Sequence, residues 1–121
     1  MTKSIELVGQ YTKAVGTGDF AAARRLLDDH LEFRGPLETF SEPEPLLDSL
    51  RKLSGVIDHI EPIKMFGDGN DVCVLYDMVT KTPAGTAFVA ELYRTKGGKI
   101  SSIRVVFDAR PFAAMFGTKS E

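Results

Sequence analysis

The chain has 121 residues, a net charge of −2, 43% hydrophobic residues and 26% charged residues, a profile typical of one soluble globular domain over residues 1–121. It contains no run of Lys or Arg, so the basic stripe that contacts phosphates in nucleic-acid-binding proteins is missing. No apolar stretch approaches the ~20 residues of a membrane-spanning helix, and the N-terminus does not resemble a secretion signal. We therefore expect a cytoplasmic protein without nucleic-acid or membrane partners.

Two helices and a short strand are predicted in the first third of the chain. Residues 3–15 carry apolar side chains at helical spacing, and Gly16–Gly18 ends this helix because glycine accepts the left-handed cap conformation. A second helix is expected over residues 20–29. The alternation of Leu31–Arg34 predicts a short strand that stops at Gly35-Pro36.

A third helix and a long strand follow. Ser41–Glu44 has the spacing of a capping box with a proline near the helix start, and this helix is expected to run to Leu53. Val56–Phe66 has the composition of a strand. Its alternation is imperfect around Pro62, which indicates a bulge or an edge position.

Three runs rich in β-forming residues, joined by two tight turns, make up most of the remaining chain. These runs are Asp71–Lys81, Thr86–Thr95 and Lys99–Asp108. Connections this short fit antiparallel neighbours, so the runs predict a three-stranded meander. A short terminal helix is expected, with Phe112, Met115 and Phe116 on one of its faces.

This order of elements, with most helices first and most strands last, predicts an α+β fold with the helices on one face of a mainly antiparallel sheet. A strongly bent sheet around helices leaves a cavity between the two layers, and such a cavity is a natural site for a small molecule. On the last strand, Ile103, Val105 and Phe107 form the more apolar face and should point into this cavity.

Three segments carry a family resemblance: Tyr11–Phe20, Leu31–Pro36, and Tyr93-Arg94 with Gly97–Ile100. In this order and spacing the chain resembles the nuclear transport factor 2-like superfamily, in its SnoaL-like and ketosteroid-isomerase-like branch. The resemblance implies a cone-shaped curved sheet wrapped around three N-terminal helices, which is a cystatin-like α+β barrel with a hydrophobic pocket. It also implies a homodimer formed through the outer face of the sheet.

The residues at the family's catalytic positions match those of its known enzymes only in part. Tyr11 matches the tyrosine of ketosteroid isomerases and Glu91 falls where their donor carboxyl group sits, whereas the base position falls at Gly35. The acid of SnoaL-like cyclases falls at Val105. The run Asp71–Lys81 lacks the Arg-x-Asp that an epoxide hydrolase needs. The standard isomerase base and cyclase acid are therefore both missing.

The resemblance also sets which faces of the two middle strands point inward. With the last strand, the positions expected to line the pocket are Val74, Tyr76, Met78, Ala87, Val89, Glu91, Tyr93, Ile103, Val105 and Phe107. Phe88, Ala90 and Leu92 would then lie on the outer face, where a dimer interface would bury them.

Glu91 and Tyr11 are the main candidates for catalysis. A carboxyl group in an apolar pocket is costly to ionise, so the pKa of Glu91 would rise and the group would act as a proton donor. Alternatively, Glu91 faces outward or forms an ion pair with Arg94 or Arg104. Tyr11 would donate its hydroxyl to a ligand, or it is an ordinary amphipathic side chain at the helix–sheet boundary.

Two further side chains have both a functional and a structural interpretation. His59 is a candidate general base because its ordinary pKa lies near physiological pH, but a hydrogen-bonded structural histidine fits the sequence equally. Arg34 at the mouth of the cone would hold an anionic ligand, or it is solvated or ion-paired. The histidines and the single cysteine show no metal-ligand spacing, so neither a metal nor a cofactor is expected.

Three functions remain open from the sequence. The first is a non-catalytic binder of a small apolar molecule. The second is an acid/base enzyme of isomerase, cyclase or dehydratase type that uses Glu91 or His59 with Tyr11. The third is a dimeric interaction module whose cavity has no ligand, which a cavity below ~300 Å³ would favour.

Overall fold

The structure is a computed structural model that describes residues 2–113. The helices are α1 (Thr2–Gly16), α2 (Phe20–Arg25), α3 (Pro43–Ser54) and the short 3-10 helix η1 (Arg110–Phe112). The strands are β1 (Leu27–Arg34), β2 (Thr39–Phe40), β3 (Ile57–Asp68), β4 (Asp71–Thr80), β5 (Thr86–Lys96) and β6 (Lys99–Val106).

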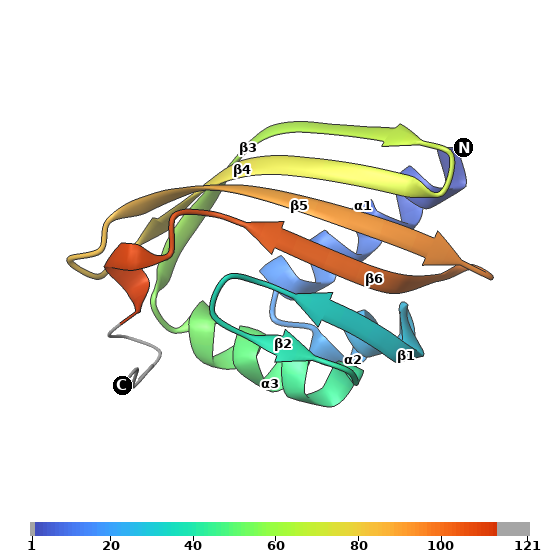
Figure 1. Cartoon of the computed structure of the whole chain (residues 1–121), viewed down its shortest axis with the longest axis horizontal. Coiled ribbons are helices and arrows are strands. Elements are labelled where there is room, and N and C mark those ends of the chain that lie inside the picture. The colour runs from blue at the N-terminus through green and yellow to red at the C-terminus, as the bar shows by residue number, and fades with distance from the viewer. Residues whose placement is uncertain (1, 114–121) are drawn as a thin grey trace.

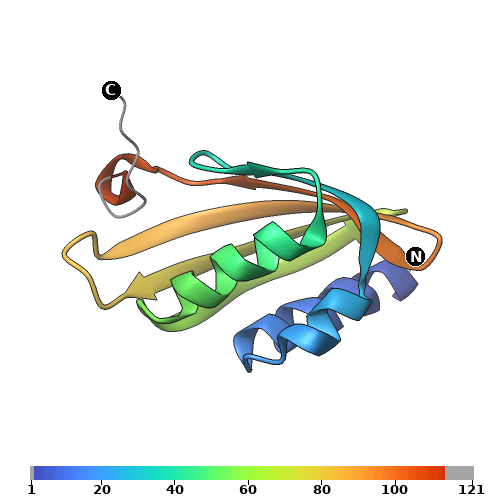
Figure 2. The ribbon, with the colours of Figure 1, turned by 90° about the horizontal axis from the view of Figure 1, so that it is seen from below.

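The strands form one curved sheet in the order β2-β1-β6-β5-β4-β3 (Figure 1). All neighbours are antiparallel except β1 and β6, which run parallel. The three α-helices lie on one face of this sheet (Figure 2). The predicted α+β fold with a mainly antiparallel curved sheet is therefore confirmed. Strands β2 and β3 are the two edge strands and do not pair with each other, so the sheet does not close into a barrel.

The main core lies between α1, α2 and the sheet. Val8, Tyr11 and Ala14 recur at helical spacing on α1 and are all buried, as the apolar stripe predicted. They pack in one cluster with Tyr93 and Ile103 on the covered face of the sheet. The sequence pattern of the first helix therefore determines which side of α1 meets the strands.

The second predicted helix is wrong in its length, because the chain turns into β1 at Leu27. Leu27 and Leu31 are fully buried, and their spacing of four fits either one helix face or one strand face. Pairing with β6 decides between the two, since Leu27 lies opposite Ile100 and the Ile100 amide donates to the Leu26 carbonyl at 2.9 Å. Sequence periodicity alone does not contain this long-range contact.

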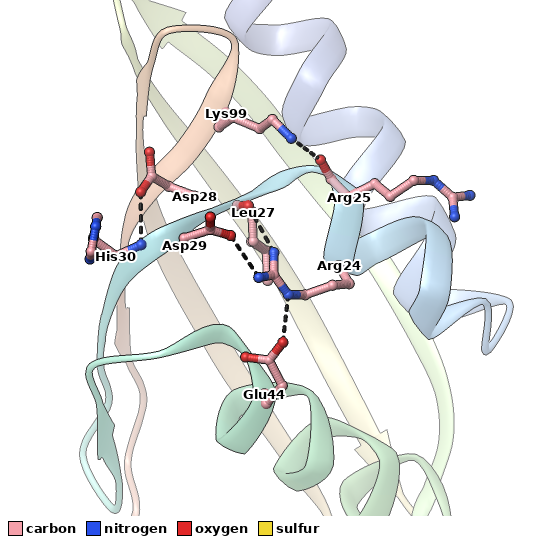
Figure 3. Close-up of polar contacts among 8 residues, drawn as sticks. All are labelled: Arg24, Arg25, Leu27, Asp28, Asp29, His30, Glu44 and Lys99. Carbon is pink, nitrogen blue, oxygen red and sulfur yellow. Dashed lines mark hydrogen bonds and ion pairs between the residues drawn. The ribbon is translucent and has the colours of Figure 1, made fainter.

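An arginine joins the short helix α2 to its neighbours (Figure 3). The Arg24 guanidinium donates to Asp29 on β1 at 2.7 Å and to Glu44 on α3 at 2.8 Å. It also donates to the Leu27 carbonyl at 3.2 Å. Beside it, Lys99 reaches the Arg25 carbonyl at 2.7 Å and so ties the start of β6 to α2.

The capping box predicted at Ser41–Glu44 is not formed. The N-cap of α3 is Glu42, which makes no side-chain cap hydrogen bond. Glu44 instead binds Arg24, and Pro43 in the first turn presets the helical backbone angle. Helix α3 ends at Ser54, one residue after the predicted Leu53, and its Leu46 and Leu47 are buried.

The strands of the second half follow the sequence closely. β3 is an edge strand with a register shift between Pro62 and Lys64, as its imperfect alternation predicted. β4, β5 and β6 form the predicted antiparallel meander. Gly97 and Gly98 both have positive φ in the β5–β6 turn, a backbone conformation that two-residue hairpins require. Of the expected terminal helix, Phe112 lies in η1, and Met115 and Phe116 lie outside the described residues.

Candidate functional site

A cavity of about 100 Å³ lies between α3, the segment after β1 and the covered face of the sheet. Most of its lining is apolar, and four side chains contribute polar atoms. The lining residues are Phe33, Gly35, Pro36, Leu37, Glu38, Leu46, Ser49, Leu50, Leu53, Tyr76, Met78, Val89, Glu91, Val105, Phe107 and Phe112. This volume is well below the ~300–1,000 Å³ of pockets for drug-sized ligands.

Glu91 is the polar centre of the sheet side of this cavity. It lies on β5, and the alternation of the strands places Tyr76 of β4 and Tyr93 of β5 on the same face. The Tyr76 hydroxyl donates to Glu91 Oε2 at 2.6 Å, and the Tyr93 hydroxyl donates to Glu91 Oε1 at 2.5 Å. Each carboxyl oxygen therefore accepts one phenol proton.

Burial and hydrogen bonding act in opposite directions on Glu91. Removal from water raises the pKa of its carboxyl group, and the hydrogen bonds from Tyr76 and Tyr93 lower it, with a net rise. Burial raises the pKa of both phenols, and the nearby Glu91 charge raises it further. Both tyrosines therefore remain protonated donors over the whole physiological pH range.

A second hydroxyl–carboxyl pair lines the cavity on the helix side. Ser49 of α3 donates its hydroxyl proton to Glu38 Oε1 at 2.5 Å. Glu38 belongs to the turn between β1 and β2, where its carbonyl also accepts the Gly35 amide proton at 2.8 Å. Sequence reasoning missed this pair, because Glu38 lies in a loop and shows no pattern that points to α3.

The inward face predicted for the strands is only partly the lining of the cavity. Tyr76, Met78, Val89, Glu91, Val105 and Phe107 line it as expected. Val74, Tyr93 and Ile103 point to the same side, but they pack into the core beside α1 and α2. Helices α1 and α3 cover different parts of this face (Figure 2). Buried side chains of α1 pack against the sheet in the core, and the cavity lies beside α3.

Tyr11 belongs to the core beside α1. It is 4% exposed, and its ring packs edge-on against Tyr93 with the centroids 5.9 Å apart. Burial raises the pKa of its hydroxyl, and the Glu91 charge adds to this rise. Tyr11 does not line the cavity, and the phenol that donates to Glu91 beside Tyr76 is that of Tyr93.

His59 and Arg34 lie away from the cavity. His59 is exposed on the edge strand β3, where its ring nitrogens contact Asp58 at 2.6 Å and Glu61 at 2.9 Å. Hydrogen bonds that the ring donates to Glu61 and, with a smaller effect, to Asp58 raise the pKa of the imidazole. Arg34 is exposed at the end of β1. The structure therefore does not bring either side chain together with Glu91.

Two lining positions bear on the chemistry that the cavity offers. Gly35 and Val105, where the resemblance puts the isomerase base and the cyclase acid, both line the cavity and carry no ionisable group. Within residues 2–113, no group of three or more His, Cys, Asp or Glu side chains is arranged to hold a metal ion. The ionisable groups of the cavity are thus two carboxyl groups and one phenol.

The opposite face of the sheet carries exposed apolar side chains. Phe88 is 57% exposed, Leu92 is 45% exposed and Val106 is 68% exposed. Phe88 and Leu92 thus lie outside as the sequence predicted. Among the helices formed by residues 2–113, none is both long and apolar enough to cross a membrane.

Known proteins share this architecture. An NTF2-like protein of unknown function from Cytophaga hutchinsonii is 31% identical, with a TM-score of 0.76 over 89% of this chain and 92% of that one. An LEH-like epoxide hydrolase from M. tuberculosis is 18% identical, with a TM-score of 0.77 over 94% and 89% of the two chains. A de novo designed protein with a curved β-sheet is 20% identical, with a TM-score of 0.81 over 96% and 93%. The same fold thus occurs in an enzyme and in a design, and does not by itself assign an activity.

Sequence comparison gives the family directly. No curated protein matches the chain. The family model of the SnoaL-like domain matches residues 8–103, which is most of the chain and includes the second part of α1, the Glu91 cluster and most of β6. The chain therefore belongs to the SnoaL-like family of NTF2-like proteins.

Proposed function

We propose that this SnoaL-like protein binds a small, mainly apolar molecule in the cavity beside α3, with Glu91 as the polar contact. The observation that carries the proposal is a carboxyl group fixed by two phenols at the wall of a mostly apolar cavity. An apolar cavity of ~150 Å³ accommodates benzene. A cavity of about 100 Å³ suits a ligand of butyl size.

Filling the cavity tests this proposal. Xenon and 1-butanol are titrated into the full chain, and binding is followed by protein NMR chemical shifts. Val105→Phe places a larger side chain in the cavity and should abolish the shifts of the lining residues. Val106→Phe makes the same change on the exposed opposite face and should leave binding intact. The absence of specific shifts in the unaltered protein, or shifts that survive Val105→Phe in a folded variant, would rule the proposal out.

An interaction module is the second candidate, and the cavity volume favours it. A cavity of about 100 Å³ is below the range of typical ligand sites, and the outer sheet face exposes Phe88, Leu92 and Val106. Under this proposal the chain forms a homodimer through that face and the cavity is only a packing defect.

A cytoplasmic location and the absence of nucleic-acid partners stay predictions from composition.

Acid/base catalysis is a third candidate, and one observation supports it. Burial raises the pKa of the Glu91 carboxyl group towards neutral pH, and a general acid or base works best when its pKa lies near the operating pH. Tyr76 is the neighbouring phenol at the cavity wall, and His59 and Tyr11 have no contact with the cavity. An isomerase or dehydratase activity abolished by Glu91→Gln would establish this function.

A further inference from the structure

The two hydroxyl groups that line the cavity already donate their protons to carboxyl groups. Tyr76 donates to Glu91 at 2.6 Å, and Ser49 donates to Glu38 at 2.5 Å. A hydroxyl group has a single proton, so each can only accept from a third partner. When the two carboxyl groups are ionised, the side chains of both pairs therefore offer oxygen lone pairs to a ligand and no donor.

The geometry around Glu91 fits an ionised acceptor. Each of its two oxygens receives a phenol proton, and hydrogen bonds donated to a carboxylate favour its ionised form. Two donors satisfy only part of the hydrogen-bonding capacity of a carboxylate. A cation in the cavity would supply the remaining partner and favour the ionised form.

The remaining lining also suits a positive charge. Among the described residues that line the cavity, none is Lys, Arg or His, so Glu38 and Glu91 have no cationic partner there. Three phenylalanine rings, those of Phe33, Phe107 and Phe112, form part of the wall. The face of an aromatic ring attracts an ammonium group, most strongly where water is excluded.

We propose that the cavity selects a small alkylammonium ion over neutral acceptors and anions of the same size. The ammonium group donates to the Glu91 carboxylate, and the alkyl chain occupies the apolar space beside α3. A ketone of equal size finds no donor among the side chains of the two pairs, and a carboxylate is repelled by both acids. This inference rests on the proposed function, because it names the ligand class of the same cavity.

Matched butyl-chain probes test this selection. Butylammonium, 1-butanol, butanone and butyrate are titrated at neutral pH into the full chain, with NMR shifts of the lining residues as readout. We expect butylammonium to bind at least about tenfold more tightly than butanone, a difference of one strong hydrogen bond. Binding of 1-butanol should be intermediate, and butyrate should not bind.

Charge-removing variants separate a contact with Glu91 from general attraction to an acidic protein. Glu91→Gln should weaken butylammonium binding at least about tenfold, the scale of a charge-assisted hydrogen bond, and should weaken 1-butanol binding less, because the amide oxygen of glutamine still accepts from a neutral hydroxyl. Glu6→Gln, at an exposed position on α1, removes the same charge far from the cavity. It should change neither affinity.

The outcomes distinguish the two proposals. Butanone binding as tightly as butylammonium, or equal ammonium affinity in Glu91→Gln and the parent, overturns the ammonium selection while small-molecule binding stands. Failure of every probe to shift the lining residues overturns the proposed function and the selection with it. Binding that ranks as expected and responds to Glu91→Gln but not to Glu6→Gln supports both.

Discussion

Glu91 shows how a few atoms determine the chemistry of the cavity. An isolated carboxylate inside protein is strongly unfavourable, and hydrogen bonds to the charged form offset part of that cost. Here the donors are two phenols that cannot lose their own protons near neutral pH, because burial raises the pKa of each. The charge state of Glu91 therefore depends on the tyrosines that hold it.

Removing either phenol should raise the pKa of Glu91 further. Tyr76→Phe and Tyr93→Phe each delete a hydrogen bond that lowers this pKa, and a hydrogen bond to a charged group contributes about 1.5–3 kcal/mol. A ¹³C NMR titration of the Glu91 carboxyl carbon measures the shift. Tyr11→Phe removes a phenol with no hydrogen bond to Glu91 and serves as the control. An unchanged pKa in both Tyr76→Phe and Tyr93→Phe would contradict the hydrogen-bonded cluster.

Glu91 should also make the free energy of unfolding depend on pH. Its carboxyl pKa is raised on folding above the ordinary value of 4.5, so the folded state binds the proton more tightly than the unfolded state. Stability then falls as pH rises from 4.5 to the folded pKa, and the loss stays constant above it. Urea unfolding across this range should show the parent losing stability relative to Glu91→Gln. A constant difference between the two proteins would contradict a raised pKa.

At the scale of elements, the short helix α2 depends on its partners. Six residues are too few for a helix to be stable alone. The Asp19 side chain caps its first turn at 3.1 Å, and Arg24 connects its last turn to β1 and α3 (Figure 3). The pairing of β1 with β6 then fixes where the helix must end.

Arg24→Ala should destabilise the protein modestly. The guanidinium is partly buried while Asp29 and Glu44 are well exposed, so solvent screens the ion pairs, and the expected loss in free energy of unfolding is about 1 kcal/mol. Arg25→Ala, at the exposed neighbouring position, should cost less than about 0.5 kcal/mol. Chemical denaturation of both variants measures the difference. Equal stabilities would mean that the Arg24 contacts contribute nothing.

At the scale of the whole molecule, the two faces of the sheet have different roles. The covered face contains the core and the cavity, and the outer face exposes Phe88, Leu92 and Val106. The same alternation that points Glu91 inward puts Leu92 outside. An apolar outer face is a natural contact for a second copy of the chain, since a two-fold interface uses the same patch twice.

A charge on the outer face should dissociate the predicted homodimer. Leu92→Glu would bury one unpaired carboxylate from each copy and weaken the dimer by on the order of a hundredfold in Kd. Sedimentation equilibrium should give a dimer for the parent and a monomer for the variant. Ala21→Glu adds the same charge at an exposed position on α2 and should leave the dimer intact. A monomeric parent would contradict this interface.

The sequence by itself determined the class of fold and the faces of the strands. Alternation along a strand is a local property, so the inward positions of Val89, Glu91 and Val105 could be read from residue types and the family resemblance. The edge position of β3 could also be read locally, because Pro62 has no backbone N–H to donate to a neighbouring strand.

Only the tertiary structure decided which inward side chains meet. The pairing of β1 with β6, the contact of Tyr93 instead of Tyr11 with Glu91, and the Ser49–Glu38 pair all join residues through packing that local patterns do not encode. The volume of the cavity is likewise the space that remains after α1 and α3 have packed on the sheet. The volume left after packing depends on all the surrounding side chains together, so no single sequence motif could predict it.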